Sequence, residues 1–575
     1  MTDTNSNNIP DSRGTNAYRA DPVFEDLMEI YLPQDSQSRI LPELDRMGAL
    51  VGDRLEDLAL AADHNPPVFK PRDRTGARAE TVVKHPAYEE LESIAFGRFG
   101  LAAMSHRAGV FDAPGTAHPV AKYALTYLFV QAEFGLCCPV SMTDSLTRTL
   151  VKFGDPALVS RFFDRLTSQD MDTLFQGAMF MTEQAAGSDV GEIETVARQQ
   201  DGEWRLTGDK WFCSNPDAAL AMVLARPDGD GAAQAGTKGL SLFLLSRHLP
   251  DGSLNSYRIL RLKDKMGTRS MASGEIALEG ATAYLVGEAG AGFKQMTDMI
   301  NMSRLANGVR SAGLMRRAVG EALFIARHRQ AFGGRLIDKP LMRRQLAKML
   351  VPTEQGRSMV LHTARVLHAA DAGDADAARV LRILTPLVKF RTCRDARKVA
   401  GDAMEVRGGC GYIEEFSDAR VLRDAHLGSV WEGTSNIIAL DVARAVRRAG
   451  ALDALDAYLT ARLAECDDDL SQELAPHVAR AVALTREVSE TGADVETRRA
   501  ASALYSAASA VFMAWESAHL RGQSGKDRAV LARMVVRHRL VPRDPLAPAG
   551  SEPEDLAGLL DRAGIDVVAA AMSAQ

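Results

Sequence analysis

The chain is poor in cysteine and aromatic residues, and it contains no long apolar run. Its six cysteines form no Cys-x-x-Cys pair and no other metal-ligand spacing, so we expect reduced thiols and no metal site. No apolar stretch approaches the roughly 18–20 residues that a membrane-spanning helix needs. Residues 1–22 are polar and lack the apolar segment of a signal peptide. These absences predict a cytoplasmic protein that does not insert into membranes.

Positive charge is not in excess either, because 68 lysines and arginines face 75 aspartates and glutamates, for a net charge of −7. Phosphate neutralisation dominates the affinity of proteins for DNA, so DNA is not an expected partner. Residues 451–575 hold 13 basic and 19 acidic side chains, which accounts for nearly all of the net charge. They also contain a local basic cluster, whose simplest interpretation is a solvated helix face. Its members are Lys526, Arg528, Arg533, Arg537, Arg539 and Arg543.

The 575 residues exceed the size of one core and predict several domain-sized units. Apolar residues recur with helical spacing up to about residue 167, short β-type runs fill 177–286, and helical spacing then returns. The stretches 293–328, 341–372 and 375–406 are long and rich in Ala and Leu, as in a helical bundle. The sequence therefore predicts an α+β multi-domain fold. The expected parts are a polar N-terminal tail (1–38), an N-terminal α domain (39–176), a central β domain (177–286), a C-terminal four-helix-bundle domain (287–449) and an additional helical C-terminal extension (450–575).

A single carboxylate, Glu432, stands in a Trp-Glu-Gly sequence just before a predicted helix. Thr434 or Ser435 can cap the start of this helix, and Gly450 can end it. A carboxylate in this place commonly does no more than complement the helix dipole. A catalytic role becomes the better interpretation only if other segments of the chain require one here.

Three glycine-containing segments upstream can bind an anion. Gly187 and Ser188 can offer backbone N–H groups and a hydroxyl to an anionic ligand, although a plain Gly-Ser turn has the same sequence. Arg329 ends a predicted long helix, where it can pair with a phosphate or offset the helix dipole. Gly408 and Gly409 end the next long helix and can let a ligand approach the backbone or act as a C-cap. Each segment alone fits both interpretations.

Four motifs occur in order along about 250 residues. They are Thr-Glu-x-x-x-Gly-Ser-Asp (182–189), Arg-x-x-Phe-Gly (329–333), Gly-Gly-x-Gly-Tyr (408–412) and Glu-Gly-Thr-Ser (432–435). Together with the α–β–α order of the chain, they resemble the acyl-CoA dehydrogenase family of flavoproteins. Further segments resemble its AidB-like branch, namely Asn65–Pro67, His85–Ala87, Cys138–Thr143, Leu262–Gly267 and Pro340–Arg343.

This resemblance implies an acyl-CoA dehydrogenase-like fold, with an N-terminal helical domain, a central β-barrel or sandwich, a C-terminal helical bundle and here an extra helical tail. It also implies a binding site for FAD. The positions that match cofactor contacts are Thr182, Gly187, Ser188, Phe212, Ser214, Arg329, Phe332, Gly408, Gly409, Thr434 and Asn436. In the family, the positions of Arg329, Phe332 and the double glycine hold the adenine end of an FAD that belongs to the neighbouring subunit. A homotetramer is therefore implied as well.

By the same resemblance, Glu432 matches the catalytic base. It would remove a proton from the carbon next to the thioester carbonyl of an acyl-CoA, while a hydride passes from the following carbon to flavin N5. The product would be a trans-2-enoyl-CoA, and an acceptor such as an electron-transfer flavoprotein would reoxidise the flavin. Substrate contacts are expected from Thr143, Arg304, Trp431 and Gly433.

Several positions depart from the family pattern. Residues 184–186 replace a Pro-Gly-Ala sequence, Phe212 replaces a flavin-side Trp, and Asn301 replaces an Asp near the substrate channel. These changes favour a branched or unusual acyl group over an ordinary straight chain. The alternative is an AidB-like flavoprotein with a DNA-associated alkylation-protection role and little dehydrogenase activity. The intact Glu432 and the acidic C-terminal segment favour the enzyme.

Overall fold

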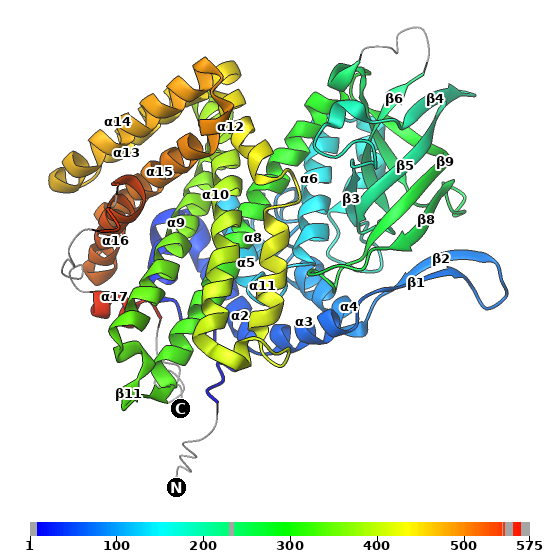
Figure 1. The fold of residues 1–575 in the computed structure, drawn as a ribbon. Coiled ribbons are helices and arrows are strands. Elements are labelled where there is room, and N and C mark those ends of the chain that lie inside the picture. The colour runs from blue at the N-terminus through cyan, green and yellow to red at the C-terminus, as the bar shows by residue number, and fades with distance from the viewer. Residues whose placement is uncertain (1–8, 229–234, 543, 547–555, 565–575) are drawn as a thin grey trace. The chain divides into compact units, whose positions relative to one another are not determined.

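A computed structural model describes residues 9–228, 235–542, 544–546 and 556–564 (Figure 1). The chain divides into two compact units. The sheet unit comprises residues 57–117 and 133–306, and the helical unit comprises residues 1–56, 118–132 and 307–575. These units do not follow the expected order of domains along the chain, because N-terminal helices share a unit with the long C-terminal helices.

The sheet unit is built around a seven-stranded sheet. Its strands are β3 (Gly177–Phe180), β4 (Val196–Gln200), β5 (Glu203–Ser214), β6 (Leu220–Pro227), β7 (Ser241–Ser246), β8 (Tyr257–Leu262) and β9 (Ser273–Val286). They pair in the order β3-β6-β4-β5-β9-β7, β8 adds to β9, and a further β6–β7 pairing closes the sheet into a barrel. Val223, Phe243 and Ile276 are fully buried in the barrel core. Closure pairs strand edges that would otherwise be open to aggregation.

A two-stranded hairpin lies outside this barrel, in a charged stretch that has no strand pattern in the sequence. Its strands are β1 (Val68–Arg72) and β2 (Arg78–Val83) (Figure 1). Glu80 on β2 has a positive φ of 45°, and its side chain anchors the hairpin. Its buried carboxylate accepts a hydrogen bond from the backbone N–H of Ile259 (3.2 Å) and pairs with Arg247 (3.3 Å). Tertiary contacts therefore override the weak strand propensity of this segment.

Helices complete the sheet unit. They are α4 (Pro86–Glu92), α6 (Cys137–Phe153) and α7 (Pro156–Leu166), while α3 (Arg54–His64) and α8 (Gly292–His328) contain residues of both units. α6 packs against β3. Pro at the first position of α4 and α7 suits a helix start, because the missing N–H has no intrahelical partner there.

The helical unit is dominated by the long helices α8, α9 (Pro340–Asp371) and α10 (Ala375–Arg407). Their bounds agree to within one residue with the three long stretches expected from the apolar spacing. Shorter helices complete this part, namely α1 (Pro22–Tyr31), α2 (Gln34–Gly52), α5 (Pro119–Phe129), α11 (Ser417–Gly428) and α12 (Ser435–Ala449). Among the described residues, no helix is both long and apolar enough to cross a membrane.

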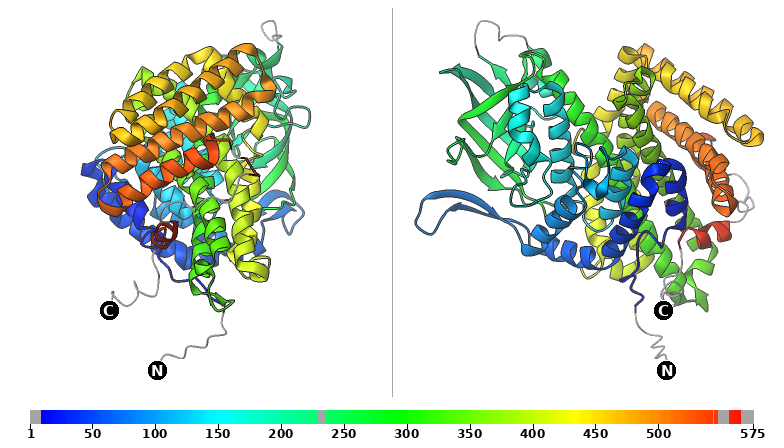
Figure 2. Two further views of the ribbon diagram at one scale, coloured as in Figure 1. Left: turned by 60° about the vertical axis from the view of Figure 1, so that its left-hand side comes forward. Right: turned by 180° about the vertical axis from the view of Figure 1, so that it is seen from behind.

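The expected helical extension belongs to this same unit. It contains α13 (Ala451–Leu463), α14 (Asp468–Thr491), α15 (Thr497–His519), α16 (Gly522–Val535) and α17 (Leu556–Arg562). The extension helices lie against the rest of the helical unit in both views of Figure 2, where they are gold to red. α15 packs on α9 and α10, and every residue from Leu504 to Glu516 is buried. The extension is therefore part of the core of the helical unit and not an appended surface layer.

A buried ionic network connects this extension with the long helix α9 and with the N-terminal segment. Arg528 on α16 contacts the carboxylates of Glu354 on α9 and Glu516 on α15. Arg357 on α9 also pairs with Glu354, and it donates a hydrogen bond to Asp21, which precedes α1 (2.6 Å). All five side chains are at most 3% exposed. Buried charges are tolerated only when they are paired, so segments from both ends of the chain must be in place together.

The prediction of a polar tail at residues 1–38 is wrong for residues 9–38, which the structure describes. This segment contains α1 and the start of α2. Phe24, Leu27 and Met28 of α1 are fully buried, and Tyr31 donates a hydrogen bond to Glu516, 485 residues away in the chain (2.8 Å). The polar residues before α1 obscured this short helix, because its packing partners are remote in the sequence.

The basic cluster of the extension does not form one continuous surface. Arg528 is fully buried in the ionic network. Arg533 is exposed but pairs with Glu473 at 3.0 Å, and Arg543 lies outside the described residues. The other exposed members are Lys526, Arg537 and Arg539. The cluster therefore gives one cation to the core and one to a surface ion pair, which leaves less charge for phosphate contacts.

The ionic network yields a stability prediction with a matched control. Arg528→Met should lower the free energy of unfolding by about 3–5 kcal/mol, because it leaves the Glu516 carboxylate buried without a guanidinium partner and Glu354 with Arg357 alone. Arg533→Met removes an exposed ion pair and should cost less than about 1 kcal/mol. The urea midpoints of the two variants, compared with wild type, measure both effects. Equal losses in the two variants would contradict a structural role for the network.

Candidate cofactor and active site

The loop between α11 and α12 holds Glu432 in an unusual backbone conformation. Glu432 has a φ of +58°, and Gly433 follows with a φ of +103°. A left-handed conformation is uncommon for a residue other than glycine, and it persists only where the surroundings impose it. A Cβ on Gly433 would lie 3.0 Å from Ile438 Cδ1. Glycine is therefore required after Glu432 by both its φ angle and its packing.

Three buried polar side chains hold this loop. Lys389 on α10 donates a hydrogen bond from Nζ to the carbonyl oxygen of Gly433. Asn307 on α8 donates from Nδ2 to the carbonyl oxygen of Gly428 at 3.0 Å. The guanidinium of Arg310, also on α8, lies 4.7 Å from the ring centroid of Trp431. All three side chains, Asn307, Arg310 and Lys389, are at most 1% exposed.

The helix after this loop begins and ends as expected, but its cap differs. α12 starts directly after Thr434 and ends at Gly450, which has a φ of +58°. Thr434 occupies the N-cap position, yet its side chain makes no capping hydrogen bond within the described part of the chain. Asn436 is exposed and accepts a hydrogen bond from Arg498 (3.3 Å). The hydroxyl of Thr434 is thus exposed beside the Glu432 loop and is not used to start the helix.

Arg329, Phe332 and Gly408 lie in one corner of the helical unit. The guanidinium of Arg329, just after α8, donates to the carbonyl oxygen of Arg407, the residue before Gly408 (3.2 Å). Gly408 ends α10 with φ 75° and ψ −145°, a combination that is open only to glycine. Gly409 follows and is exposed. The structure therefore brings together two motifs that are about 80 residues apart in the sequence.

Phe332 is presented at the tip of a short hairpin in this corner. β10 (Gln330–Ala331) and β11 (Gly334–Arg335) pair around Phe332 and Gly333, whose φ angles are +52° and +74°. Positive φ at both central residues is the signature of a type I′ hairpin turn. Lys339 donates to the carbonyl oxygen of Phe332 (2.8 Å), and the Phe332 side chain is 93% exposed. A rigidly held, fully exposed aromatic ring is suited to contact a partner or a ligand.

A buried charge cluster lies behind Gly408. Arg407 donates to the Asp418 carboxylate (2.7 Å) and contacts the carboxylate of Glu321. Burial raises the pKa of Asp418 to about 6, with Arg407 opposing this shift and Glu321 adding to it. Glu321 also accepts a hydrogen bond from Ser12 (2.7 Å) and pairs with Arg317 (3.1 Å). The backbone that leads into Gly408 is thus fixed by the core of the helical unit.

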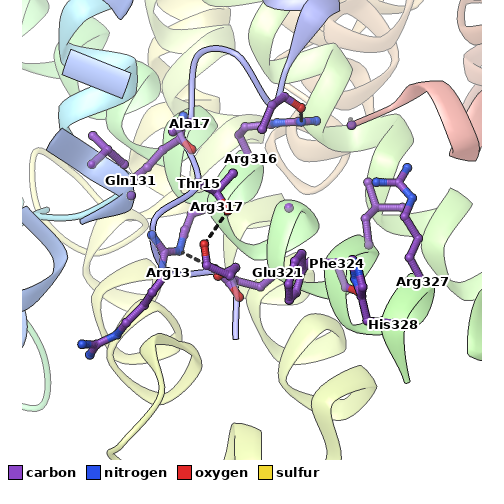
Figure 3. A pocket seen from close by; sticks show the side chains of 17 residues that line it. Arg13, Thr15, Ala17, Gln131, Arg316, Arg317, Glu321, Phe324, Arg327 and His328 are labelled. Atoms are coloured by element: carbon purple, nitrogen blue, oxygen red, sulfur yellow. Dashed lines mark hydrogen bonds and ion pairs between the residues drawn. The ribbon is translucent and has the colours of Figure 1, made fainter. Parts of the chain in front are cut away.

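Figure 3 shows the cavity beside this cluster, which has a volume of about 90 Å³. Its walls come from the first described residues, from the end of α2 and from α8. Glu321 and Arg317 pair with one another in its wall, and Phe324 and His328 also line it. The cavity contains none of the expected site residues.

In the sheet unit, Thr182, Phe212 and Ser214 come together beside the barrel. The backbone N–H of Trp211 on β5 donates to the carbonyl oxygen of Thr182 (2.8 Å). Cys213 points into the barrel core, so its neighbours Phe212 and Ser214 lie on the opposite face. Phe212 is 59% exposed there. These three expected cofactor residues therefore lie together near the C-terminal end of β5.

Gly187 and Ser188 lie on an exposed loop whose base is firmly held. Glu183, at the start of the loop, pairs with the buried Lys210 and accepts a hydrogen bond from the backbone N–H of Glu194 (2.6 Å). A Cβ on Gly187 would meet no described atom within 4 Å. The protein's own packing therefore does not require glycine at this position, and close approach of a ligand to the backbone gives a reason for it.

The two expected substrate residues of the sheet unit differ in what the structure allows. Thr143 on α6 is fully buried, and its hydroxyl donates to the carbonyl oxygen of Pro139 and accepts from the backbone N–H of Gly177, both at 2.8 Å. The hydroxyl of Thr143 joins α6 to β3 in this structure, and its expected contact with a substrate stays a prediction. Arg304 is half-buried on the part of α8 that belongs to the sheet unit.

Comparisons with known proteins identify the family. Residues 7–173 match the model of the adaptive response protein AidB N-terminal domain, 178–281 match the acyl-CoA dehydrogenase middle domain, and 290–447 match the acyl-CoA dehydrogenase C-terminal domain. The chain is 34% identical over 437 residues to acyl-CoA dehydrogenase family member 11 of Caenorhabditis elegans, which covers 75% of this chain and 70% of that protein. The chain belongs to the acyl-CoA dehydrogenase family.

Its place within the acyl-CoA dehydrogenase family is the AidB-like branch. It is 36% identical over 412 residues to AidB of Escherichia coli (strain K12), which covers 69% of this chain and 73% of AidB. The crystal structure of Caenorhabditis elegans ACDH-11 in complex with C11-CoA matches with a TM-score of 0.86 and 28% identity over 95% of both chains. These matches confirm the expected fold of helical parts around a central β-barrel, and the structural match extends into the C-terminal extension.

The motifs of the sequence include the Glu432 loop but not the three side chains that contact it. Asn307, Arg310 and Lys389 lie within long helices, where a polar residue carries no signal that distinguishes it from a solvated one. The helical periodicity of α8 and α10 could have placed them on a buried face. Which loop they reach is decided by packing between helices.

The Asp418 cluster yields a pH prediction. Because the folded pKa of about 6 exceeds the ordinary 3.8, the native state keeps a proton that the unfolded chain releases between these values. The stability from this group is complete below about pH 3.8 and is lost as the pH rises through 6. Wild type loses this stability as the pH rises, whereas Asn in Asp418→Asn does not titrate. The unfolding free energy of Asp418→Asn minus that of wild type should therefore rise by up to about 3 kcal/mol between pH 4 and 7. Denaturant titrations at both pH values measure it, and a difference that does not change with pH would contradict the raised pKa.

Proposed function

We propose that this AidB-like protein is an FAD-dependent acyl-CoA dehydrogenase that acts on a branched or otherwise unusual acyl-CoA and forms a trans-2-enoyl-CoA. One observation carries the proposal. Glu432, the family's catalytic position, is kept in a left-handed conformation by a loop with three buried polar contacts. Backbone strain that the surroundings must maintain is concentrated at functional sites. A carboxylate that only complemented a helix dipole would not need it.

The proposed chemistry assigns one role to each part of this loop. The Glu432 carboxylate takes the proton from the carbon next to the thioester carbonyl, which is general-base catalysis. Trp431, whose ring is fixed by Arg310, and Gly433 form the wall of the site on either side of the base. Arg304 is retained as a proposed substrate contact. A base held in one geometry contributes to rate because its reacting oxygen does not have to search for the proton.

Residues in each unit, taken separately, have features that fit FAD binding. Gly187 leaves open space at its Cβ position, Gly408 adopts a backbone conformation available only to glycine, and Arg329 presents an exposed guanidinium. When bound, FAD would supply the acceptor for the substrate hydride. The chain residues proposed to hold it are Thr182, Gly187, Ser188, Phe212, Ser214, Arg329, Phe332, Gly408, Gly409, Thr434 and Asn436.

A homotetramer is the proposed assembly. The support is the set of large apolar side chains that the helical unit exposes, since such side chains commonly mark protein interfaces. They include Phe332 (93% exposed), Leu341 (82%) and Tyr412 (80%). An electron-transfer flavoprotein is the proposed acceptor that reoxidises the reduced cofactor. The basic cluster gives the DNA-associated alternative only weak support, because Arg528 is buried and Arg533 is paired, which leaves Lys526, Arg537 and Arg539 exposed.

The cofactor proposal predicts a yellow protein with about one FAD per chain and a mass above that of a monomer. Arg329→Ala should remove a charge-assisted contact of about 1.5–3 kcal/mol and weaken FAD binding roughly 10- to 150-fold. Arg379→Ala is the control, since Arg379 is also exposed but pairs with Asp376 at the start of α10. Flavin titration of the apo-protein and light scattering measure these effects. Unchanged FAD affinity in Arg329→Ala, or a strictly monomeric holoprotein, would refute the shared site.

The catalytic proposal predicts that Glu432→Gln retains FAD but reduces it at least 10²–10⁴-fold more slowly, because the amide cannot accept the proton. Anaerobic bleaching of the flavin with a panel of straight, branched and bulky acyl-CoAs provides the measurement and also identifies the acyl group. Glu415→Gln is the control, since Glu415 is an exposed carboxylate seventeen positions upstream. Reduction of Glu432→Gln at the wild-type rate would mean that Glu432 is structural.

A further inference from the structure

We infer that Lys389 is a positioning residue for Glu432, an inference that rests on the proposed function. Lys389 lies in the middle of α10 and is 1% exposed. Its ammonium donates a hydrogen bond to the carbonyl oxygen of Gly433, the residue bonded directly to Glu432. The contact joins a rigid helix of 33 residues to the loop that carries the base.

A lysine at this position needs an explanation. An ammonium group removed from water costs several kcal/mol unless hydrogen bonds or opposite charges compensate it. An apolar side chain of similar length would fill the same space in α10 without this cost. The Gly433 carbonyl is one partner that offsets the cost, and what the protein gains is a fixed position for that carbonyl.

The backbone around Glu432 is the part of the loop that most needs such a contact. A left-handed residue other than glycine is strained by about 1–3 kcal/mol and tends to relax to negative φ. Gly433 allows the conformation sterically, but glycine also adds the greatest backbone freedom of any residue. Lys389 donates to the carbonyl of this flexible residue. The hydrogen bond therefore opposes a change of Glu432 to negative φ, because that change would move the Gly433 carbonyl.

The other contacts hold different parts of the loop. Asn307 fixes Gly428 and Arg310 packs on the Trp431 ring, so both act before Glu432 in the chain. On the following side, Thr434 makes no capping hydrogen bond within the described residues. Lys389 takes the place of the missing cap as the anchor that follows the base. Glu432 is therefore held between contacts from α8 and α10.

Three variants test this role. Lys389→Met keeps the length of the side chain and removes the ammonium, and Lys389→Gln keeps an N–H donor on a shorter side chain. Lys398→Met is the matched control, because Lys398 lies on the same helix but is exposed and pairs with Asp402 (2.9 Å). The first measurement is hydrogen exchange of the backbone amides of residues 431–436, followed by mass spectrometry. It requires no substrate.

We expect exchange of this segment to accelerate at least tenfold in Lys389→Met, less in Lys389→Gln, and not at all in Lys398→Met. With an acyl-CoA that reduces the wild type, the rate of flavin bleaching at saturation should fall about 10- to 100-fold in Lys389→Met, since small displacements of a reacting group have effects of this size. KM and FAD content should stay near wild type. Lys389→Gln should recover part of the rate.

Unchanged exchange in Lys389→Met would overturn the inference, as would faster exchange with a wild-type rate of bleaching. A rise in KM or loss of FAD without a lower saturated rate would also overturn it, because binding and not base position would then depend on Lys389. If no acyl-CoA reduces even the wild type, the proposed dehydrogenase function fails. The exchange measurement would still decide whether Lys389 fixes the loop.

Discussion

The helical unit depends on the pairing of charges that it has buried. Asp21, Glu354, Arg357, Glu516 and Arg528 come from three helices and one N-terminal segment, and each would be costly without its partners. This requirement joins the two ends of the chain to the long helix α9. It explains why the C-terminal extension is a core element and why an N-terminal segment of polar appearance is folded. It also removes Arg528 from any surface that could contact DNA.

The supports of the candidate site lie on two other long helices, α8 and α10, and α10 packs against α9 of the network. α8 provides Asn307 and Arg310, and α10 provides Lys389, while Gly408 stands at the end of α10. Long, well-packed helices move little, so they can hold two left-handed loop residues, Glu432 and Gly433, against relaxation. The loops supply the chemistry of the site, and the helices supply its geometry. The packing of α10 on α9 thus connects the ionic network with the supports of the candidate site.

Motifs in the sequence were sufficient for the family and the fold class. The three long helices were predicted to within one residue, because sustained apolar periodicity is the strongest local signal of structure. The predictions failed where local signal and tertiary environment disagree. The β1–β2 hairpin is charged, and α1 is a short helix that follows a polar segment.

The sequence by itself determined that a Trp-Glu-Gly loop precedes a helix that stops at Gly450, that two glycine-containing segments follow long helices, and that the order of elements is α–β–α–α. Only the tertiary structure decided that Glu432 is left-handed, that Arg329 meets the backbone before Gly408, and that Lys389 reaches Gly433. The physical reason is the range of the forces involved. Periodicity, caps and turns are set by residues within a few positions of each other, whereas buried polar contacts join residues whose proximity exists only after the helices have packed.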